Sequence, residues 1–292
     1  MEKLIDRLYR RIACAGHVCI GLDTDISYLP DQLKKDNACD ALFHFNREII
    51  DATLDTAAVY KVQIAYYESL GLRGLNAYMK TLGYLREKNA IVIADVKRGD
   101  IAKTAEMYAK AHFTGDFEAD FITLNPFMGM DTLEPFFPYL DAGEKGLFAL
   151  VATSNPGACD IEGIVASDGE SVSDKTGAMI KEKGVRFTGD CGYSLIGAVV
   201  GCTNKVQTKQ IRSRLDGVFF LIPGYGAQGG KAEDMAGYLD KNANGGVVNS
   251  SRGILLAYKK PEYSGLGFAE AARAETVRMR DEILSAVKGK EV

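Results

Sequence analysis

A short stretch around residue 95 combines charged side chains that could together do acid–base chemistry. Asp95, Lys97 and Asp100 follow an apolar, largely β-branched run that predicts a buried strand over residues 91–95. Side chains two apart on a strand point the same way, so the Asp95 carboxylate and the Lys97 ammonium should lie together. A fixed ammonium of this kind can stabilise a developing carbanion and then supply its proton.

Each of these residues also has an ordinary structural explanation. Asp100 stands where it could cap a helix predicted over residues 101–111. Asp95 and Lys97 could be a surface ion pair at a sheet edge. The joint pattern is harder to explain in this way, so we interpret it as a candidate site.

Apolar segments that predict strands alternate with helical patterns along the whole chain. The predicted strands are residues 18–23, 58–63, 91–95, 121–124, 147–153, 195–201, 218–222 and 246–249. The predicted helices are residues 2–12, 39–57, 71–88, 101–111, 131–139, 173–183, 205–215, 232–240 and 268–287. Eight such units in 292 residues fit a closed (β/α)8 TIM barrel. An open doubly wound sheet is the alternative, but the first strand is not followed by a Gly-x-Gly fingerprint.

We expect residues 1–292 to form a single barrel domain. Residues 154–193 are the least regular part, and they hold too few large apolar residues for a core of their own. We therefore interpret them as an insertion-rich connection between the fifth and sixth strands.

Polar residues gather where the predicted strands end. Active sites of (β/α)8 barrels lie at the carboxyl ends of the strands, so these side chains should converge there. The residues at or just past a strand end are Asp23, Lys61, Gln63, Asp95, Lys97, Thr153 and Ser154.

Two loops near the carboxyl terminus have the composition of a phosphate site. The glycine-rich loop over residues 223–230 includes Pro223, Gln228 and Gly229, and it precedes a predicted helix. Glycines let backbone N–H groups approach a phosphate, and a helix N-terminus favours an anion. The loop after the eighth strand offers Arg252 between Ser251 and Gly253. A tight turn is the plain alternative for either loop, but barrels commonly bind phosphate after these two strands.

The overall composition is that of an ordinary globular protein, with 47% apolar and 25% charged residues. A net charge of −4 gives no reason to expect nucleic acid or an anionic membrane as a partner. The six cysteines are scattered, as in a cytoplasmic protein with reduced thiols, and the three histidines lack metal-ligand spacing. We also expect no signal peptide and no membrane span.

Taken together, these motifs resemble the orotidine 5′-phosphate decarboxylase family. The resemblance rests on Asp95-x-Lys97-x-x-Asp100-Ile101, on a lysine that closes the second strand, and on the 223–230 and 252–253 loops. The run Thr153-Ser-Asn-Pro-Gly157 and the segment after it resemble the longer branch of that family. The resemblance implies conversion of orotidine 5′-monophosphate to UMP and CO2, the last step of de novo pyrimidine nucleotide synthesis, without metal or organic cofactor.

The resemblance also implies roles for individual residues. The alternating catalytic network would be Lys61, Asp95, Lys97 and Asp100. Residues that reach into a partner's site, and so make the protein a homodimer with shared sites, would be Asp100, Ile101 and Thr104. Asp23 and Lys61 would hold the ribose, and Ser154 with Thr153 would bind the pyrimidine. Gln228 would bridge the base and the phosphate, and Arg252 would bind the phosphate. The substrate-binding set is completed by Gln63, Pro223, Gly229, Ser251 and Gly253.

Two other functions remain open at this stage. A metal-dependent sugar-phosphate aldolase shares the D-x-K-x-x-D motif, and it would need Mg²⁺ and a further acidic ligand near Asp95. A non-catalytic barrel would bind UMP and leave orotidine 5′-monophosphate intact.

Overall fold

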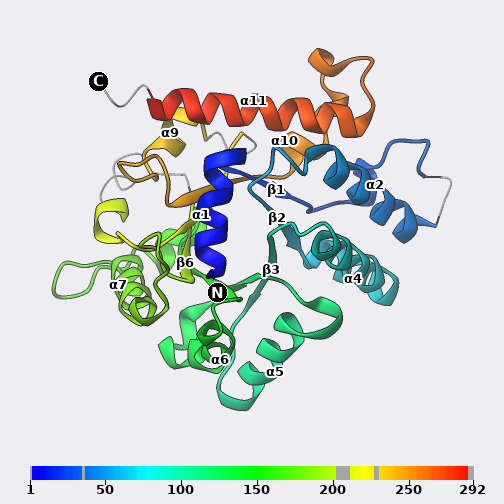
Figure 1. Ribbon diagram of the computed structural model, residues 1–292. Coiled ribbons are helices and arrows are strands. Elements are labelled where there is room, and N and C mark those ends of the chain that lie inside the picture. Colours follow the sequence, from blue (N-terminus) through cyan, green and yellow to red (C-terminus); the bar gives the residue numbers. More distant parts are fainter. Residues whose placement is uncertain (1, 35–36, 202–210, 227–229, 289–292) are drawn as a thin grey trace.

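The computed structural model describes residues 2–34, 37–201, 211–226 and 230–288. The eight strands in these ranges are parallel and follow one another in chain order around a closed barrel (Figure 1). They are β1 (Val18–Gly21), β2 (Val59–Gln63), β3 (Val92–Arg98), β4 (Phe121–Leu124), β5 (Gly146–Ala152), β6 (Ile196–Val200), β7 (Phe220–Pro223) and β8 (Gly246–Ser250). This confirms the predicted (β/α)8 barrel and excludes the open doubly wound sheet.

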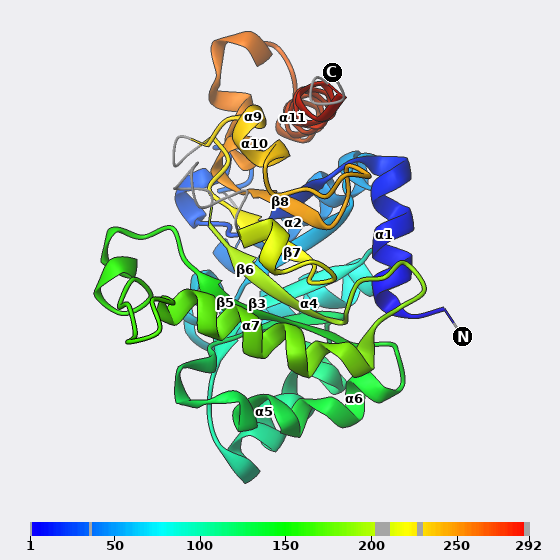
Figure 2. The ribbon, with the colours of Figure 1, turned by 90° about the vertical axis from the view of Figure 1, so that its left-hand side faces the viewer.

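Helices surround the barrel on its outer side (Figures 1 and 2). They are α1 (Leu4–Ala15), α2 (Ala38–Thr53), α3 (Ala65–Glu68), α4 (Gly71–Glu87), α5 (Ala102–Phe113), α6 (Phe137–Asp141), α7 (Val172–Gly184), α9 (Ala232–Ala236), α10 (Arg252–Leu255) and α11 (Phe268–Lys288). No helix among the described residues has the length and apolar character needed to cross a membrane.

Helix α1 covers the amino-terminal end of the barrel rather than its side. Its apolar stripe, which includes Leu8 and Ile12, is buried. The Leu4 amide donates to the Gly143 carbonyl, just before β5, at 2.7 Å. Figure 2 shows α1 on one side of the barrel and the loops that follow β5 on the other. The carboxyl ends of the strands are therefore left open for a site.

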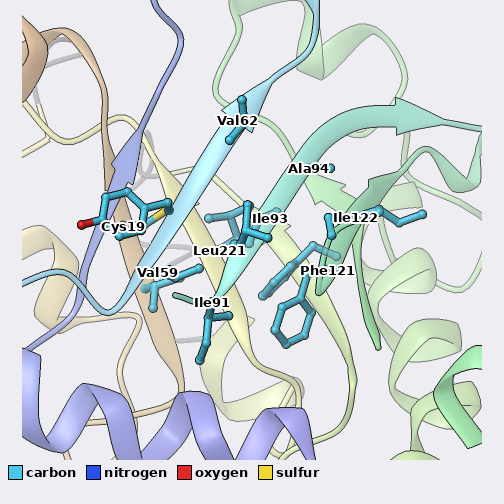
Figure 3. Packing of buried hydrophobic residues seen from close by; sticks show 14 of the residues in the cluster. Cys19, Val59, Val62, Ile91, Ile93, Ala94, Phe121, Ile122 and Leu221 are labelled. Carbon is cyan, nitrogen blue, oxygen red and sulfur yellow. The ribbon is translucent and has the colours of Figure 1, made fainter. Parts of the chain in front are cut away.

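The barrel is filled by apolar side chains from facing strands. Figure 3 shows Cys19, Ile93 and Leu221 among the side chains packed there, and all three are buried. Because such interiors are packed as densely as organic crystals, the strands are held in fixed positions. The polar side chains at the strand ends therefore project from a rigid frame.

Strand register brings the predicted polar residues to one rim. In the parallel pairing of β2 with β3, Lys61 lies opposite Ile93 and Gln63 opposite Asp95. In the pairing of β1 with β2, Gly21 lies opposite Lys61, so Asp23 follows just beyond. The carboxyl ends of parallel strands meet on the same edge, as the sequence predicted.

The predicted end of the third strand is wrong. β3 continues past Asp95 to Arg98, which pairs with Leu124 of β4 after an irregularity in the register. Helix α5 begins at Ala102, with Ile101 as its N-cap, so Asp100 is not the cap that we expected. The apolar run ends before Lys97 and Arg98, but pairing with β4 extends the strand through these charged residues at the open rim.

Other boundaries differ by a few residues. Helix α2 ends at Thr53 and α9 at Ala236, both short of the prediction. Residues 131–139 form the 3-10 helix η4 (Met130–Phe136) followed by α6. Most of the helix predicted over residues 205–215 lies outside the described residues. The 154–193 connection contains η5 (Pro156–Asp160), α7 and η6 (Val185–Phe187).

Candidate active site

The carboxylate of Asp95 is the centre of a buried hydrogen-bond network. Its Oδ2 accepts from Lys61 Nζ at 3.1 Å and from Gln63 Nε2 at 2.9 Å. Its Oδ1 accepts from Lys97 Nζ at 2.6 Å and from Thr123 Oγ1 at 2.9 Å. Asp95 is only 6% exposed. A carboxylate has about four lone-pair sites, so this one is fully satisfied by donors from β2, β3 and β4.

The charges of this network stabilise one another. Burial alone would raise the pKa of Asp95, but the ammonium groups of Lys61 and Lys97 lower that pKa to about 2. Burial likewise acts to lower the pKa of Lys61, yet the carboxylates of Asp23 and Asp95 raise it above its ordinary value. The Asp95 carboxylate and the Lys61 ammonium therefore stay ionised at neutral pH.

The network continues to the first and last strands of the barrel. Lys61 Nζ donates to Asp23 Oδ1 at 2.9 Å, and the Ser251 hydroxyl donates to Asp23 Oδ2 at 2.7 Å. Asn249 Nδ2 donates to Ser251 Oγ at 3.3 Å. The predicted residues Asp23, Lys61, Asp95 and Lys97 are thus brought together in one protomer.

An unusual backbone conformation places Lys97. Its φ is +44°, in the left-handed region that non-glycine residues seldom adopt. The amides of Val96 and Lys97 both donate to Thr123 Oγ1, at 3.0 and 2.9 Å, where the pairing of β3 with β4 is irregular. The hydroxyl of Thr123 therefore holds the turn that brings Lys97 Nζ back to Asp95. The Lys97 side chain is 45% exposed, so its ammonium group faces both the network and the open rim.

Asp100 is not part of this network within one protomer. Its Oδ1 accepts from the Ile101 amide at 2.8 Å, which is the hydrogen bond found for its side chain in the described part of the chain. Ile101 is 51% exposed, and Thr104 is exposed on α5. Within the described part of the chain, none of these three side chains is hydrogen-bonded or ion-paired to the network that the other predicted catalytic residues form.

The end of β5 is fixed by a glutamate from the 154–193 connection. Glu162 accepts from the Thr153 amide at 2.7 Å and from Thr153 Oγ1 at 2.6 Å. The hydroxyl of Thr153 also contacts Asn155 Oδ1 at 2.7 Å. Ser154 is half-buried and packs closely against Gly201. A Cβ built on Gly201 would lie only 2.8 Å from the Ser154 backbone nitrogen. The Thr153 side chain is thus bound within its own loop, whereas Ser154 is held in place by close packing.

Only part of the predicted phosphate site falls within the described residues. Pro223 ends β7, and Gly224 and Gly226 have positive φ, which explains the glycines there. Gln228 and Gly229 lie outside the described residues.

The loop after β8 can be described in full. Arg252 is exposed as the first residue of α10, and its guanidinium has no ion-pair partner in the described part of the chain. A Cβ on Gly253 would lie 2.7 Å from Ser250 Oγ, so a larger residue here would require the Ser250 side chain to move.

Three contributing residues were not predicted from the sequence: Thr123, Glu162 and Asn249. Thr123 and Asn249 had a signal, since each is a polar residue within an apolar strand. Glu162 gave no such signal in the sequence, because no pattern in an irregular segment indicates which residue a given side chain contacts.

The described residues contain no group of three or more His, Cys, Asp or Glu side chains placed to hold a metal ion. Near Asp95 the positions where further acidic ligands would be needed are taken by Lys61, Lys97 and Gln63. The arrangement is therefore suited to placing fixed positive charge beside a reacting carbon.

Comparison with known proteins agrees with this geometry. Residues 16–265 match the profile of the orotidine 5′-phosphate decarboxylase / HUMPS family. An orotidine 5′-phosphate decarboxylase from Clostridium perfringens is 58% identical over 286 residues, covering 97% of this chain and 99% of that protein. One from Clostridium acetobutylicum is 60% identical over 282 residues, covering 96% and 98%.

Solved structures give the same result. An orotidine 5′-monophosphate decarboxylase from Leishmania donovani has a TM-score of 0.76 at 26% identity and covers 98% of this chain and 99% of that one. A Streptomyces avermitilis structure, proposed to be the same enzyme, has a TM-score of 0.82 at 30% identity and covers 99% and 97%. The chain therefore belongs to the orotidine 5′-phosphate decarboxylase / HUMPS family.

Proposed function

We propose that this protein decarboxylates orotidine 5′-monophosphate to UMP, the last step of de novo pyrimidine nucleotide synthesis. The observation that carries the proposal is the buried Asp95 carboxylate, held between the ammonium groups of Lys61 and Lys97 at the carboxyl ends of β2 and β3. Relatives that carry this enzyme's name are about 58% identical over nearly the full length of the chain.

Lys97 is assigned the chemical step. The bond from C6 of the pyrimidine to the carboxylate breaks, CO2 leaves, and the electron pair stays on C6. The Lys97 ammonium, fixed by Asp95 and exposed on the rim side, stabilises that pair and then transfers a proton to C6. The neutral amine regains its proton from solvent. The preorganised charge of Lys97, more than repulsion between Asp95 and the substrate carboxylate, is assigned the lowering of the reaction barrier.

The remaining rim residues are assigned to binding. Asp23 and Lys61 hold the ribose hydroxyls, with Ser251 orienting Asp23. Because the hydroxyl of Thr153 is bound by Glu162, we assign the pyrimidine contact to Ser154. Gln63 orients Asp95, since its amide donates to that carboxylate. The phosphate is assigned to Arg252, Gly253, Pro223, Gln228 and Gly229.

We further propose a homodimer in which Asp100, Ile101 and Thr104 complete the partner's site. Asp100 has no contact with the lysines of its own protomer in the described part of the chain. Large apolar side chains are exposed in the segments that follow β2, β3 and β4, next to the same rim. They are Leu72, Ile101, Met107, Phe127 and Met128. Exposed apolar side chains gathered in this way are typical of a protein–protein interface.

We also propose that residues 1–292 act as one domain and that the protein works in the cytoplasm. In support of the first point, the strands at both ends of the chain, β1 and β8, pair directly. In support of the second, the described cysteines are free thiols.

The deciding experiment is an ultraviolet assay of orotidine 5′-monophosphate, run with and without EDTA. We expect turnover that EDTA leaves unchanged. A metal-dependent aldolase of the same family would lose activity on chelation and would act on a sugar phosphate. A barrel that only binds UMP would leave the substrate spectrum unchanged, and that result would refute the proposal.

A further inference from the structure

A cavity lies at the opposite end of the barrel from the proposed active site, lined by residues of α1 and residues just before β2 and β3. It has a volume of about 380 Å³ and is open to solvent on one side. Its lining includes the apolar side chains of Leu54, Ala57 and Ile91 and the ring of Tyr60. Small-molecule sites in proteins usually begin at about 300 Å³, so the cavity is large enough for a small ligand.

The charged residues that line this cavity are all cationic. They are Arg7, Arg10, Arg11 and Lys88, and no carboxylate lines the cavity. Cationic side chains around an apolar surface suit a ligand that combines an anionic group with a flat or apolar one.

Three of these cations have carboxylate partners that lie outside the cavity lining. Arg10 is paired with Glu2 at 2.6 Å, and Lys88 with Asp51 at 2.9 Å. Arg7 makes a longer contact of 3.4 Å with Asp120. All three side chains are exposed at their outer ends, so they can reorient toward a ligand at small cost.

Arg11 differs from the other three because it is held by backbone carbonyls instead of a carboxylate. Its Nε and Nη2 donate to the Ala57 carbonyl at 3.1 and 3.0 Å, and Nη2 also donates to the Leu54 carbonyl. The nearby Asp55 is bound through both oxygens by Arg273. Arg11 therefore presents a fixed guanidinium whose charge no ion pair offsets among the described residues. Its Nη1 makes none of these bonds.

We propose that this cavity binds a small organic phosphate. The phosphate group meets Arg11 and the mobile ends of Arg10 and Lys88, and the organic part lies on Ala57, Tyr60 and Ile91. A guanidinium held in advance loses little conformational entropy when it binds a phosphate, which favours this arrangement. The site is separate from the catalytic rim, although Tyr60 is the immediate neighbour of Lys61 in β2.

The test is calorimetric titration with phenyl phosphate, a probe that joins a phosphate to an apolar ring. The titrated protein carries Arg252→Ala, so that the phosphate clamp proposed for the catalytic site does not contribute. We expect one binding site that weakens as salt is added. Adding Arg11→Gln should weaken binding at least about tenfold, because a charged hydrogen bond is lost.

Controls keep the result interpretable. Arg214→Gln, an exposed arginine paired with Asp174 far from the cavity, should leave binding unchanged. If Arg11→Gln fails to fold, Arg10→Gln replaces it, since Arg10 holds no backbone group and should still weaken binding. Inorganic phosphate should bind more weakly than phenyl phosphate, because it cannot use the apolar surface.

Three results would overturn the proposal. The first is that phenyl phosphate does not bind. The second is that Arg11→Gln or Arg10→Gln leaves its affinity unchanged. The third is that Arg214→Gln lowers its affinity as much as the cavity substitutions do. If inorganic phosphate bound as tightly as phenyl phosphate, the proposed contact between the organic group and the apolar surface would be refuted. Because binding is measured and not turnover, none of these results depends on the proposed catalytic function.

Discussion

The contact between Glu162 and Thr153 makes a specific prediction about substrate recognition. Glu162→Ala removes the two hydrogen bonds that Glu162 accepts from Thr153 at the end of β5. Ser154, the next residue, would keep its packing against Gly201 but lose one constraint on its backbone, and the pyrimidine contact that we assign to it should weaken. Glu162→Gln should retain most of the contact, because its carbonyl can accept from the Thr153 amide and its amino group can donate to Thr153 Oγ1.

The expected magnitude follows from the exposure of the contact. Hydrogen bonds to a charged acceptor contribute about 1.5–3 kcal/mol each when buried. Glu162 is half-buried, so water can replace part of the contact after truncation. We therefore expect a combined loss of about 1.4 kcal/mol, which corresponds to about a tenfold decrease in kcat/KM. Because the lost contact orients bound substrate, most of this change should be in KM.

The assay is steady-state decarboxylation of orotidine 5′-monophosphate, followed by ultraviolet absorbance in five variants. Glu170→Ala is the matched control, an exposed glutamate in the same connection. Glu162→Gln should stay within about threefold of the unchanged protein. On a Thr153→Val background, Glu162→Ala should cost less than it does alone, because one of its two contacts is already absent.

Two outcomes would refute this reasoning. One is an unchanged KM in a Glu162→Ala protein that still unfolds at the normal temperature. The other is an equal loss in Glu170→Ala, which would mean that general loosening of the connection is responsible.

Four further predictions concern charged residues proposed to act at the site. Lys97→Ala should reduce turnover by more than about a thousandfold while UMP still binds, because general-acid and electrostatic contributions are both lost; normal turnover would remove Lys97 from the chemistry. Arg252→Ala should raise KM by at least about tenfold, since a charge-assisted contact to phosphate is removed; an unchanged KM would place the phosphate elsewhere. Mixing Asp95→Ala with Asp100→Ala protein should restore some activity through hybrid dimers, and no restoration would argue against shared sites. The pKa of Asp95 is lowered to about 2 in the folded state, so its contribution of about 2 kcal/mol is present above pH 4 and is lost as the pH falls toward 2; urea unfolding of Asp95→Asn should show a shallower decline over that range, and an equal decline would refute it.

The strands that sequence predicted best are those with an uninterrupted apolar run. β4 matches its prediction because Phe121–Leu124 is apolar or β-branched and is bounded by Asp120 and Asn125. β3 was predicted too short, because Lys97 and Arg98 are charged and end the apolar run. The pairing of Arg98 with Leu124 of β4 extends the strand, and the local sequence gives no sign of that pairing. Local sequence patterns indicate which residues are buried. The residue at which a strand ends depends instead on its pairing with the neighbouring strand.

The same distinction applies to the site. Asp23, Lys61 and Asp95 were found because each charged residue closes an apolar strand, and a barrel brings strand ends together. Thr123 and Glu162 act through contacts with residues 9 to 28 positions away, which no spacing rule encodes. The φ of +44° at Lys97 could not be predicted either, because it results from the Thr123 hydrogen bonds.

The bond between Ser251 and Asp23 joins positions 228 residues apart, across the seam where β8 meets β1. A ribosome makes Asp23, Lys61 and Lys97 long before it makes Ser251. While translation continues, the nascent chain has no eighth strand to close the ring, and Asp23 lacks the hydroxyl that orients it. Catalytic competence should therefore arise only after nearly all of the polypeptide has left the exit tunnel.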